Sequence, residues 1–461
     1  KSWWLMFGLF ETGFQFFYWG SALMLLIGGA LIYLGISKKM EPLLLVPIGF
    51  GILLINLPLG GLMDYELQIT NTTGVPGGVI SIEVDEASSI GEDDVILKLD
   101  SGEVLAPIYG RLKEINVSLG QEIAPGEVIA VMITTAQTDQ AEIPTTPMGL
   151  LSRIFAYGIM WQIIPPLIFL CLGALTDFGP MIANPKTLLL GAAAQFGVYF
   201  AFFAALAANF FMPNGFSIAE AASIGIIGGA EGPTTIYVTS ILAPHIIGAT
   251  AVATYSYMAL VPLIRPPTIN LLTTKKERAI YMKPQLREVP AREKILFPVF
   301  ASIIIILFVP MAAPLIGMFM VGNLFAVSGV TERLSKTVST ALIDVLTIFL
   351  TLAIGASMTA DNFFLPKTLL VLALGAVAFA TATAAGVLTA KLMNLFSEEK
   401  INPMIGAAGV SAVPMSARVV QVMGQKANPR NFLLMHAMGP NVAGAIGAAI
   451  AGGVFLGMIG R

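Results

Sequence analysis

Long apolar runs recur along the chain, and no other feature limits its possible folds as strongly. A helix needs about 20 apolar residues to cross a lipid bilayer. Of the 461 residues, 56% are hydrophobic and only 11% are charged. The sequence therefore predicts an all-α polytopic membrane protein. The apolar runs lie at residues 17–36, 154–175, 187–211, 295–315, 340–358, 368–388 and 432–456.

The remaining composition excludes several classes of protein. A net charge of −3 gives no support for nucleic acid binding. Cys171 is the only cysteine, so disulfides within the chain are excluded. His245 and His436 are the only histidines and are far apart, so no transition-metal site is expected. No Gly-x-x-x-x-Gly-Lys-Ser/Thr phosphate loop occurs, which argues against ATP as the energy source.

Charged residues gather in a few segments between the apolar runs. Residues 265–294 hold eight of the 25 lysines and arginines against three acidic residues. Short basic loops stay in the cytoplasm, so the loop 266–294 is expected there, and counting spans from it places the acid-rich insert outside. The expected domains are N-terminal membrane helices (1–63), an extramembrane insert (64–147), a first membrane repeat (148–265), the basic loop with connecting helices (266–334) and a second membrane repeat (335–461).

The insert contains an internal repeat. Segments 79–99 and 112–132 align with an offset of 33, and apolar residues alternating around glycine-containing turns predict short strands. Two such halves resemble the barrel-sandwich fold of biotinyl and lipoyl carrier domains, so a small all-β insert is expected. The hairpin that would present a biotinylated lysine reads "LDSGE", and Lys98 precedes this turn. A docking or spacer role is therefore favoured over a biotin-carrying role.

The membrane part is duplicated as well. "PKTLL" occurs at 185–189 and 366–370, an offset of 181. At the same offset "IGIIGGAEGP" (224–233) matches "IGAAGVSAVP" (405–414). The predicted spans run in opposite directions in the two copies, so the copies are expected to be inverted. Inverted repeats are common in secondary transporters, which bind their substrates between the repeats near the bilayer midplane.

Both matched segments have the pattern Gly-x-x-Gly-x-x-x-x-Pro, which is too glycine-rich for a plain spanning helix. Interrupted helices or re-entrant hairpins at equivalent positions indicate a transport site. Close helix packing through small residues is the plainer alternative. Glu231 in the first segment favours a site, because a carboxylate at membrane depth is costly unless a partner or a substrate stabilises it. Oxygen ligands suit a hard cation such as sodium.

Other polar residues extend the candidate site. Arg418 lies four residues beyond Pro414, where it either binds a carboxylate ligand or forms a structural pair with Glu231. Asn402 opens the second segment and is suited to cap a half-helix. Tyr257 lies in an apolar run, where a phenol needs a hydrogen-bond partner. Further polar residues in apolar surroundings are Asp177, Tyr255, Asp344, Ser411, His436 and Asn441.

Several long stretches are similar to the beta subunit of sodium-translocating biotin-dependent decarboxylases, a family of oxaloacetate, methylmalonyl-CoA and glutaconyl-CoA enzymes. The similarity covers about 23–62 and 150 to the C-terminus. The stretches that carry it are "EPLLLVPIGFG", "LTDFGPMIANPKTLLLGAAAQFG", "IGIIGGAEGPTTIY", "ATYSYMALVPLI", "KILFPV", "INPMIGAAGVSAVPMSARV" and "NFLLMHAMGPNVAGAIGAAIAGG".

The resemblance implies that the chain decarboxylates carboxybiotin and drives sodium out of the cell. It implies catalytic roles for Glu231, Tyr257 and Arg418. It also implies a sodium site; with the polar residues noted above, the expected ligands are Glu231, Asn402, Gly406, Ser411 and Asn441. The family's acid in the "GGA-acid-GPT" motif is normally aspartate, so Glu231 reaches one methylene further.

The resemblance also implies cofactors, partners and a location. Carboxybiotin comes from a partner subunit, and no biotin is attached to this chain. The expected partners are a carboxyltransferase alpha subunit, a biotin carrier subunit and small membrane subunits, with several copies of this chain in the complex. The expected location is the inner membrane of a bacterial cell. An inverted-repeat symporter for sodium and an organic anion is the alternative, and a purely structural membrane anchor explains Glu231 least well.

Overall fold

The computed structural model describes residues 17–57, 60–71, 73, 75–85, 89–90, 93–107, 110–134, 145–212, 215–283 and 287–460. The first 16 residues of the expected N-terminal membrane segment lie outside these ranges. The chain divides into two compact units. One is rich in strands and lies within Leu54–Tyr157, and the other is helical and comprises Trp19–Leu53 and Gly158–Arg461.

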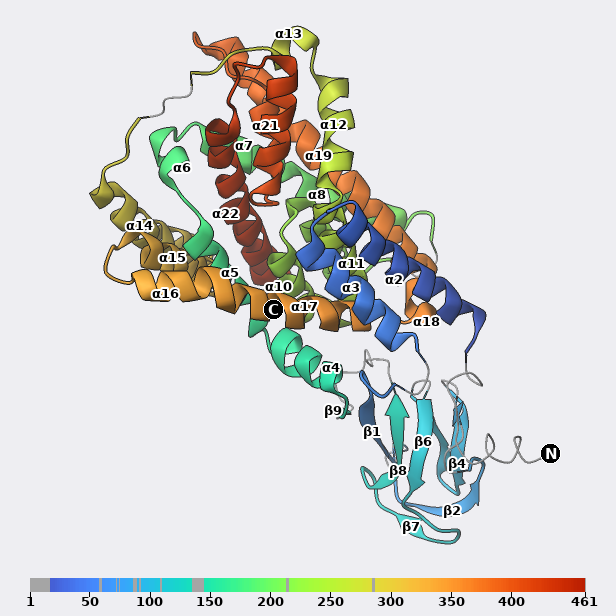
Figure 1. Cartoon of the computed structure of the whole chain (residues 1–461). Coiled ribbons are helices and arrows are strands. Elements are labelled where there is room, and N and C mark those ends of the chain that lie inside the picture. The colour runs from blue at the N-terminus through green and yellow to red at the C-terminus, as the bar shows by residue number, and fades with distance from the viewer. Residues whose placement is uncertain are drawn as a thin grey trace, which may run out of the picture. The chain divides into compact units, whose positions relative to one another are not determined.

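The strand-rich unit forms two antiparallel sheets (Figure 1). Its described strands are β1 (Tyr65–Thr70), β2 (Gly77–Ile82), β3 (Ser89–Ile90), β4 (Val95–Leu99), β5 (Gly102–Leu105), β6 (Gly110–Ile115), β7 (Glu122–Ile123), β8 (Val128–Thr134) and β9 (Thr145–Pro147). One sheet has the order β3-β6-β8-β1-β9 and the other β5-β4-β2-β7. Alternate strand residues, among them Leu67, Ile96 and Ile129, fill one apolar core.

These strands follow the 33-residue repeat of the sequence. β2 begins at 77 and β6 at 110, β3 at 89 and β7 at 122, and β4 at 95 and β8 at 128. The two halves are interleaved, because β2 pairs with β7 and β3 pairs with β6. In the β4–β5 hairpin the turn falls at Asp100 and Ser101, while Lys98 lies in β4 and pairs with Glu103 at 3.4 Å. The insert is therefore a two-sheet unit without a lysine at this hairpin turn.

The helical unit contains most of the apolar runs. Its described helices, with the short ones that lead into it, are α2 (Trp19–Ser37), α3 (Pro42–Ile55), α4 (Leu150–Arg153), η2 (Ile154–Met160), α5 (Ile164–Leu175), α6 (Gly179–Ala183), α7 (Thr187–Ala194), α8 (Phe196–Ala208), α9 (Ile218–Gly225), η3 (Ile226–Gly229), α10 (Gly232–Leu242), η4 (Pro244–Ile246), α11 (Ile247–Ala259), α12 (Val261–Leu272), α13 (Lys275–Arg278), α14 (Ala291–Phe308), η5 (Pro310–Ala312), α15 (Ala313–Val327), α16 (Glu332–Thr337), η6 (Val338–Leu342), α17 (Ile343–Ala356), α18 (Ala360–Phe363), α19 (Pro366–Phe396), α20 (Met404–Ala407), α21 (Met415–Ala427) and α22 (Leu434–Ile459).

Within the described ranges, six helices are long and apolar enough to cross a membrane, or up to eight if each of two bent pairs forms one span. The six are Trp19–Ser37, Thr187–Ala208, Pro310–Val327, Glu332–Ala356, Pro366–Phe396 and Leu434–Ile459. The bent pairs are Leu150–Met160 with Ile164–Leu175 (69°) and Pro244–Ala259 with Val261–Leu272 (70°). These helices make the chain a helical membrane protein, as predicted.

Two apolar runs differ from the sequence expectation. The run 295–315 is divided, because α14 ends at Phe308 and a new helix begins at Pro310, a residue that lacks the N–H needed to continue α14. The run 154–175 bends between Met160 and Ile164. The basic segment also begins later than its charges indicate, since residues 261–272 form α12 and bury Arg265.

The helices of the two predicted membrane repeats occur in the same order. α5, α6, α7 with α8, the α9–α10 pair and α11 correspond in sequence order to α17, α18, α19, the α20–α21 pair and α22. α22, dark red in Figure 1, lies inside the helical unit against α6, α7, α10 and α21. Small residues allow these close contacts, as where Gly444 on α22 meets the Gly409 carbonyl.

An asparagine near the end of each long helix forms two hydrogen bonds to the backbone just before the interrupted segment, and this pair of bonds is called the asparagine clamp. Asn209, after α8, donates to the Phe216 carbonyl at 2.7 Å and accepts from the Phe216 N–H at 2.6 Å. Asn394, near the end of α19, makes the same two bonds with Ile401 at 2.7 and 2.8 Å. The same pair of hydrogen bonds thus precedes each of the two interrupted segments.

Candidate functional site

The first break lies between α9 and α10, at the glutamate of "IGIIGGAEGP". The α-helix gives way to the 3₁₀ turn η3, and Ala230 then adopts a left-handed conformation (φ 56°). Glu231 is extended (φ −122°) and starts α10, with its side chain buried. Thr235 donates to the Glu231 carbonyl through its N–H (3.0 Å) and its hydroxyl (2.9 Å). The carboxylate of Glu231 is therefore buried inside the protein at the N-terminus of α10.

The second break lies between α20 and α21, and its backbone carbonyls are bound by donor side chains. Asn441 donates to the carbonyls of Ala408 and Val410, both at 3.0 Å. Arg265 donates to Ala407 at 3.2 Å and to Val410 at 3.4 Å. These donors satisfy carbonyls that an interrupted helix leaves without intrahelical partners.

The two breaks touch each other. Ser411 of the second break donates through its hydroxyl to Glu231 Oε2 of the first, and its N–H donates to the Gly229 carbonyl at 3.2 Å. Both side chains are buried. The predicted ligands Glu231 and Ser411 therefore meet, although they are 180 residues apart in the sequence.

Tyr255, not Tyr257, lies against the first break. An ideal Cβ built on Gly232 would lie 2.7 Å from the Tyr255 hydroxyl oxygen, so glycine is required for this approach. The Tyr257 hydroxyl donates to the Leu372 carbonyl on α19, and its ring packs edge-on against Phe379. The prediction that the Tyr257 phenol needs a partner is met, and that partner is a backbone carbonyl of α19 instead of Glu231.

Asn402 and Gly406 hold the second break in place. The Asn402 side chain donates to the carbonyls of Arg278 (2.8 Å) and Ile280 (3.0 Å) and accepts from the Met404 N–H (3.1 Å), although the N-cap residue of α20 is Pro403. Gly406 packs directly on Gly386 of α19, where an ideal Cβ would lie 2.0 Å from the Gly386 carbonyl oxygen. The Asn402 side chain and Gly406 thus make contacts that position the break.

Buried polar atoms without a hydrogen-bond partner gather around the two breaks. Among the described residues there are five such side-chain atoms, and only Asn323 Oδ1 lies elsewhere, between α5 and α15. The other four are Gln195 Oε1, Thr234 Oγ1, Asn441 Oδ1 and Arg265 Nε. Buried polar atoms are seldom left unpaired, and three of these four atoms are oxygens, the type of atom that hard cations bind.

Gln195 and Thr234 were missed by the sequence analysis. Gln195 separates α7 from α8 and donates to the Gly444 carbonyl at 3.1 Å, and its Oε1 would be 3.6 Å from a Cβ on Gly229. Thr234 lies three residues after Glu231 on α10. A lone amide inside the run 187–211 was the available signal for Gln195. Nothing in the sequence distinguishes Thr234 from the neighbouring Thr235.

Arg418 lines a cavity of about 690 Å³ beyond the second break. Four basic residues face this cavity against one acidic residue, and they are Lys275, Arg278, Arg418 and Lys426 against Glu41. Met415 and Val419 contribute apolar walls. The Arg418 guanidinium has no ion-pair partner among the described residues, so the alternative of a structural pair with Glu231 is not supported. The cavity is suited to an anion that carries an apolar body.

The charges of the cavity act on Glu41. Partial burial raises the pKa of the Glu41 carboxyl above its usual value, and the positive charge of Arg418 opposes this rise. Arg418 is thus the basic residue of the cavity whose charge acts on this carboxyl group.

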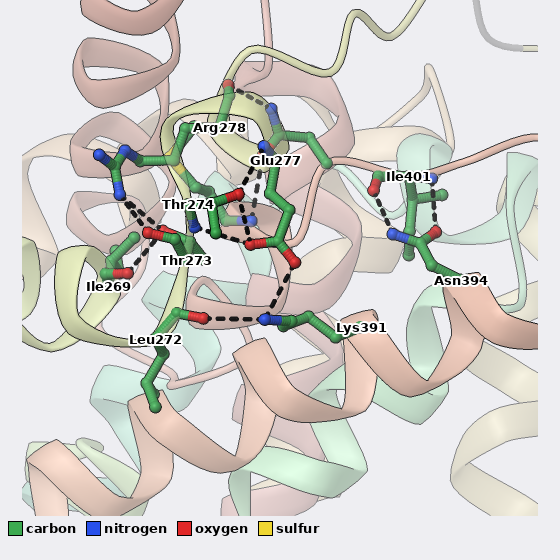
Figure 2. Close-up of polar contacts among 11 residues, drawn as sticks. Ile269, Leu272, Thr273, Thr274, Glu277, Arg278, Lys391, Asn394 and Ile401 are labelled. Atoms are coloured by element: carbon green, nitrogen blue, oxygen red, sulfur yellow. Dashed lines mark hydrogen bonds and ion pairs between the residues drawn. The ribbon is translucent and has the colours of Figure 1, made fainter.

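The basic end of the helical unit is tied to α19, as Figure 2 shows. Glu277 accepts from the N–H and hydroxyl of Thr274 and pairs with Lys391 at 2.9 Å. Lys391 also donates to the Leu272 carbonyl at the end of α12. These contacts fix α12 and α13 against the helix that Gly406 packs on.

Comparison with known proteins identifies the family. A profile described as the Na⁺-transporting oxaloacetate decarboxylase beta subunit matches residues 20–459. The chain is 50% identical to the oxaloacetate decarboxylase beta chain of Klebsiella pneumoniae over 439 residues (95% of this chain, 94% of the relative). It is also 50% identical to the methylmalonyl-CoA decarboxylase subunit beta of Propionigenium modestum over 450 residues (98% of each chain). The chain belongs to the sodium-transporting decarboxylase beta subunit family.

Proposed function

We propose that this chain decarboxylates carboxybiotin held by a partner subunit and couples that step to sodium export. The observation that carries the proposal is the contact between the two breaks through Glu231 and Ser411. It brings a buried carboxylate from one copy of the membrane repeat to a hydroxyl from the other. A cation bound there would touch both copies and would therefore respond to any movement between them.

We assign sodium, the transported ion, to the oxygens around this contact. Glu231 and Ser411 supply side-chain oxygens, and Asn441 Oδ1, Gln195 Oε1 and Thr234 Oγ1 are the unpaired oxygens nearby. Asn402 and Gly406 act in this proposal as positioning residues, because their contacts shape the second break. Hard cations favour this all-oxygen set of ligands.

We assign the carboxyl group of carboxybiotin to the cavity beside Arg418. The guanidinium suits a carboxylate, and the apolar walls suit a ring system. In the reaction the N–C bond breaks, carbon dioxide leaves, and the ring nitrogen keeps the electron pair and takes up one proton. Weak solvation of the carboxylate favours this step. Tyr257 was predicted to act in the proton path, and its bond to Leu372 supports instead a role in positioning α11.

The coupling in this proposal rests on inverted repeats. The equal order of helices and the paired Asn209 and Asn394 clamps support a duplicated unit. We assign the basic segment 266–294 to the cytoplasmic side, where carboxybiotin arrives, and the insert 64–147 to the outside of a bacterial inner membrane. Sodium would then enter from the cavity side and leave on the other.

We assign the formation of carboxybiotin to a carboxyltransferase alpha subunit and its delivery to a biotin carrier subunit. Small membrane subunits and further copies of this chain complete the assembly. The interleaved 33-residue halves of the insert support a barrel-sandwich fold. The absence of a lysine at Asp100 and Ser101 supports a docking or spacer role for it.

The test uses the complex in sealed vesicles, with carboxybiotin labelled at its carboxyl group. Labelled carbon dioxide and radioactive sodium uptake are measured together, with and without sodium. We expect carbon dioxide release to require sodium and the two rates to rise together. A full rate without sodium would contradict the coupling. Anion uptake without carbon dioxide release would favour the symporter.

Arg418 variants test the assignment of the cavity. Arg418→Gln should raise KM for carboxybiotin about tenfold, because a charge-assisted hydrogen bond to the carboxylate is lost at an exposed side chain. Arg418→Lys should recover part of this loss. Sodium affinity should stay unchanged in both variants, because Arg418 makes no contact with Glu231. An unchanged KM in Arg418→Gln would place the carboxyl group elsewhere.

A further inference from the structure

Arg265 is a fully buried arginine inside α12. Its side chain is 0% exposed and is the largest of the fully buried side chains. Within the described part of the chain, no Asp or Glu lies within 4.0 Å of its guanidinium. Among the described residues, its hydrogen bonds go to the Ala407 carbonyl at the end of α20 and to the Val410 carbonyl of the second break, and its Nε has no partner. This is a cation held by backbone dipoles alone.

Hydrogen bonding alone does not explain a charge at this position. Burying an unpaired ion costs several kcal/mol, far more than burying a neutral amide. Asn441 donates to the same Val410 carbonyl with a neutral side chain at 3.0 Å, a shorter bond than the 3.4 Å bond from Arg265. A neutral donor would therefore satisfy the backbone at lower cost. The positive charge itself needs an explanation.

The position of Arg265 relative to Glu231 supplies one. Arg265 binds the carbonyl of Val410, and the next residue, Ser411, donates to Glu231. The guanidinium and the carboxylate thus contact consecutive residues of one break without forming an ion pair. The guanidinium therefore binds the residue next to the one that donates to the carboxylate, and a buried site screens charges less than water does.

We propose that Arg265 is a tethered cation that weakens sodium binding at Glu231 and thereby promotes release of the ion. The inference rests on the sodium site proposed above. Repulsion from a fixed positive charge raises the free energy of the sodium-bound state. The same charge stabilises the Glu231 carboxylate after the ion has left. A transport site needs both effects, because an ion that binds too tightly is released too slowly to complete the cycle.

Neutral variants of Arg265 test this role in the purified complex. Sodium affinity is measured by equilibrium binding of radioactive sodium, and KM for sodium and kcat are measured by carbon dioxide release. Arg265→Gln should bind sodium about tenfold more tightly, with a lower KM for sodium and a lower kcat. Arg265→Lys keeps the charge and should stay within about twofold of the parent protein. Arg333→Gln, at an exposed arginine on α16, is the matched control and should change nothing.

The outcomes separate this inference from the proposed function. If the parent protein binds no sodium, the proposed function fails and Arg265 has no site to act on. If the parent binds sodium and Arg265→Gln binds it equally or more weakly, only the Arg265 inference is overturned. Arg265→Met is a second neutral variant for the case in which Arg265→Gln does not fold. If neither neutral variant folds while Arg265→Lys does, the charge serves folding and the inference is also overturned.

Discussion

The two breaks have the same sequence pattern and opposite chemistry. The first presents a buried carboxylate, Glu231, beside the unpaired Thr234 hydroxyl. The second presents carbonyls bound by the guanidinium of Arg265 and the amide of Asn441. One break therefore attracts a cation, while the other already holds one. Two segments with one sequence pattern thus differ in charge through a few side chains outside that pattern.

The difference assigns separate tasks to the two halves. In the proposed function, the first break supplies charge for the ion, and the second supplies Ser411 as the link between the halves. The second break also leads directly into α21, which carries Arg418 into the cavity. A change at the second break can therefore reach both the ion and the carboxyl group, which is what coupling between them requires.

The largest expected effect comes from removing the charge of the first break. Glu231→Gln keeps the shape of the side chain, and we expect KM for sodium to rise about a hundredfold or more because a charged ligand is lost. Sodium-dependent carbon dioxide release measures this. Glu332→Gln, at an exposed glutamate of α16, is the control. Glu231→Asp should keep the sodium dependence, since it restores the acid usual in the family.

A Glu231→Gln variant with normal sodium dependence would contradict the assignment of the ion to the first break. The two breaks would then differ in charge without differing in function, and close packing of small residues would be the better explanation of both.

The next effect tests the link between the breaks. Ser411→Ala removes the hydrogen bond to Glu231, and we expect sodium affinity to fall about tenfold because a buried carboxylate loses its donor. Ser416, at the start of α21, is the matched control, since its hydroxyl donates to the Val410 and Ala412 carbonyls of the same break. Equilibrium sodium binding should distinguish Ser411→Ala from Ser416→Ala. Equal losses in both variants would mean that the break is merely destabilised.

A substitution of Gln195 should have a smaller effect, and it tests whether the sodium site extends to this residue. Gln195→Met removes one unpaired oxygen near Gly229, and we expect KM for sodium to rise about fivefold with little change in kcat. Asn323→Leu is the control, because Asn323 also has a buried unpaired oxygen but lies between α5 and α15. If both variants change KM for sodium alike, the unpaired oxygens do not mark the ion site.

Sequence reasoning found the parts of the site that depend on pattern. The duplicated Gly-x-x-Gly-x-x-x-x-Pro segments indicated paired breaks, and the structure joins them through Glu231 and Ser411. It could not decide which tyrosine faces the first break. Tyr255 and Tyr257 are two positions apart, which is about 200° around a helix, so only the rotation of α11 separates them. That rotation is set by tertiary packing.

The basic segment was predicted by counting lysines and arginines along the sequence, and this count does not show that Arg265 is buried. A basic segment was predicted from 265 onward, and α12 continues to Leu272 with Arg265 buried inside it. Its hydrogen-bond partners are backbone carbonyls about 140 residues away in the sequence. A pattern of side chains cannot predict such partners. Arg418 was expected near a carboxylate. A helix that starts after a break can run in several directions, so the sequence alone does not give the position of Arg418. In the structure α21 places Arg418 at the cavity.

The smallest expected effect concerns the contacts of Glu277 with Thr274 and Lys391, which hold α13 against α19. Although partial burial raises it, the hydrogen bonds from Thr274 and the ion pair with Lys391 hold the pKa of Glu277 below its usual value. Because this pKa is lower in the folded state, the stabilisation is present above the unfolded pKa of about 4.3 and is lost as pH falls through the folded value. Glu277→Gln should lower stability at pH 7 by less than about 1 kcal/mol, since the pair is partly exposed. Thermal unfolding in detergent should show a small difference from the parent at pH 7 that vanishes in acid. A difference that grows in acid would mean that the carboxylate opposes the fold, and α12 with Arg265 would need another anchor.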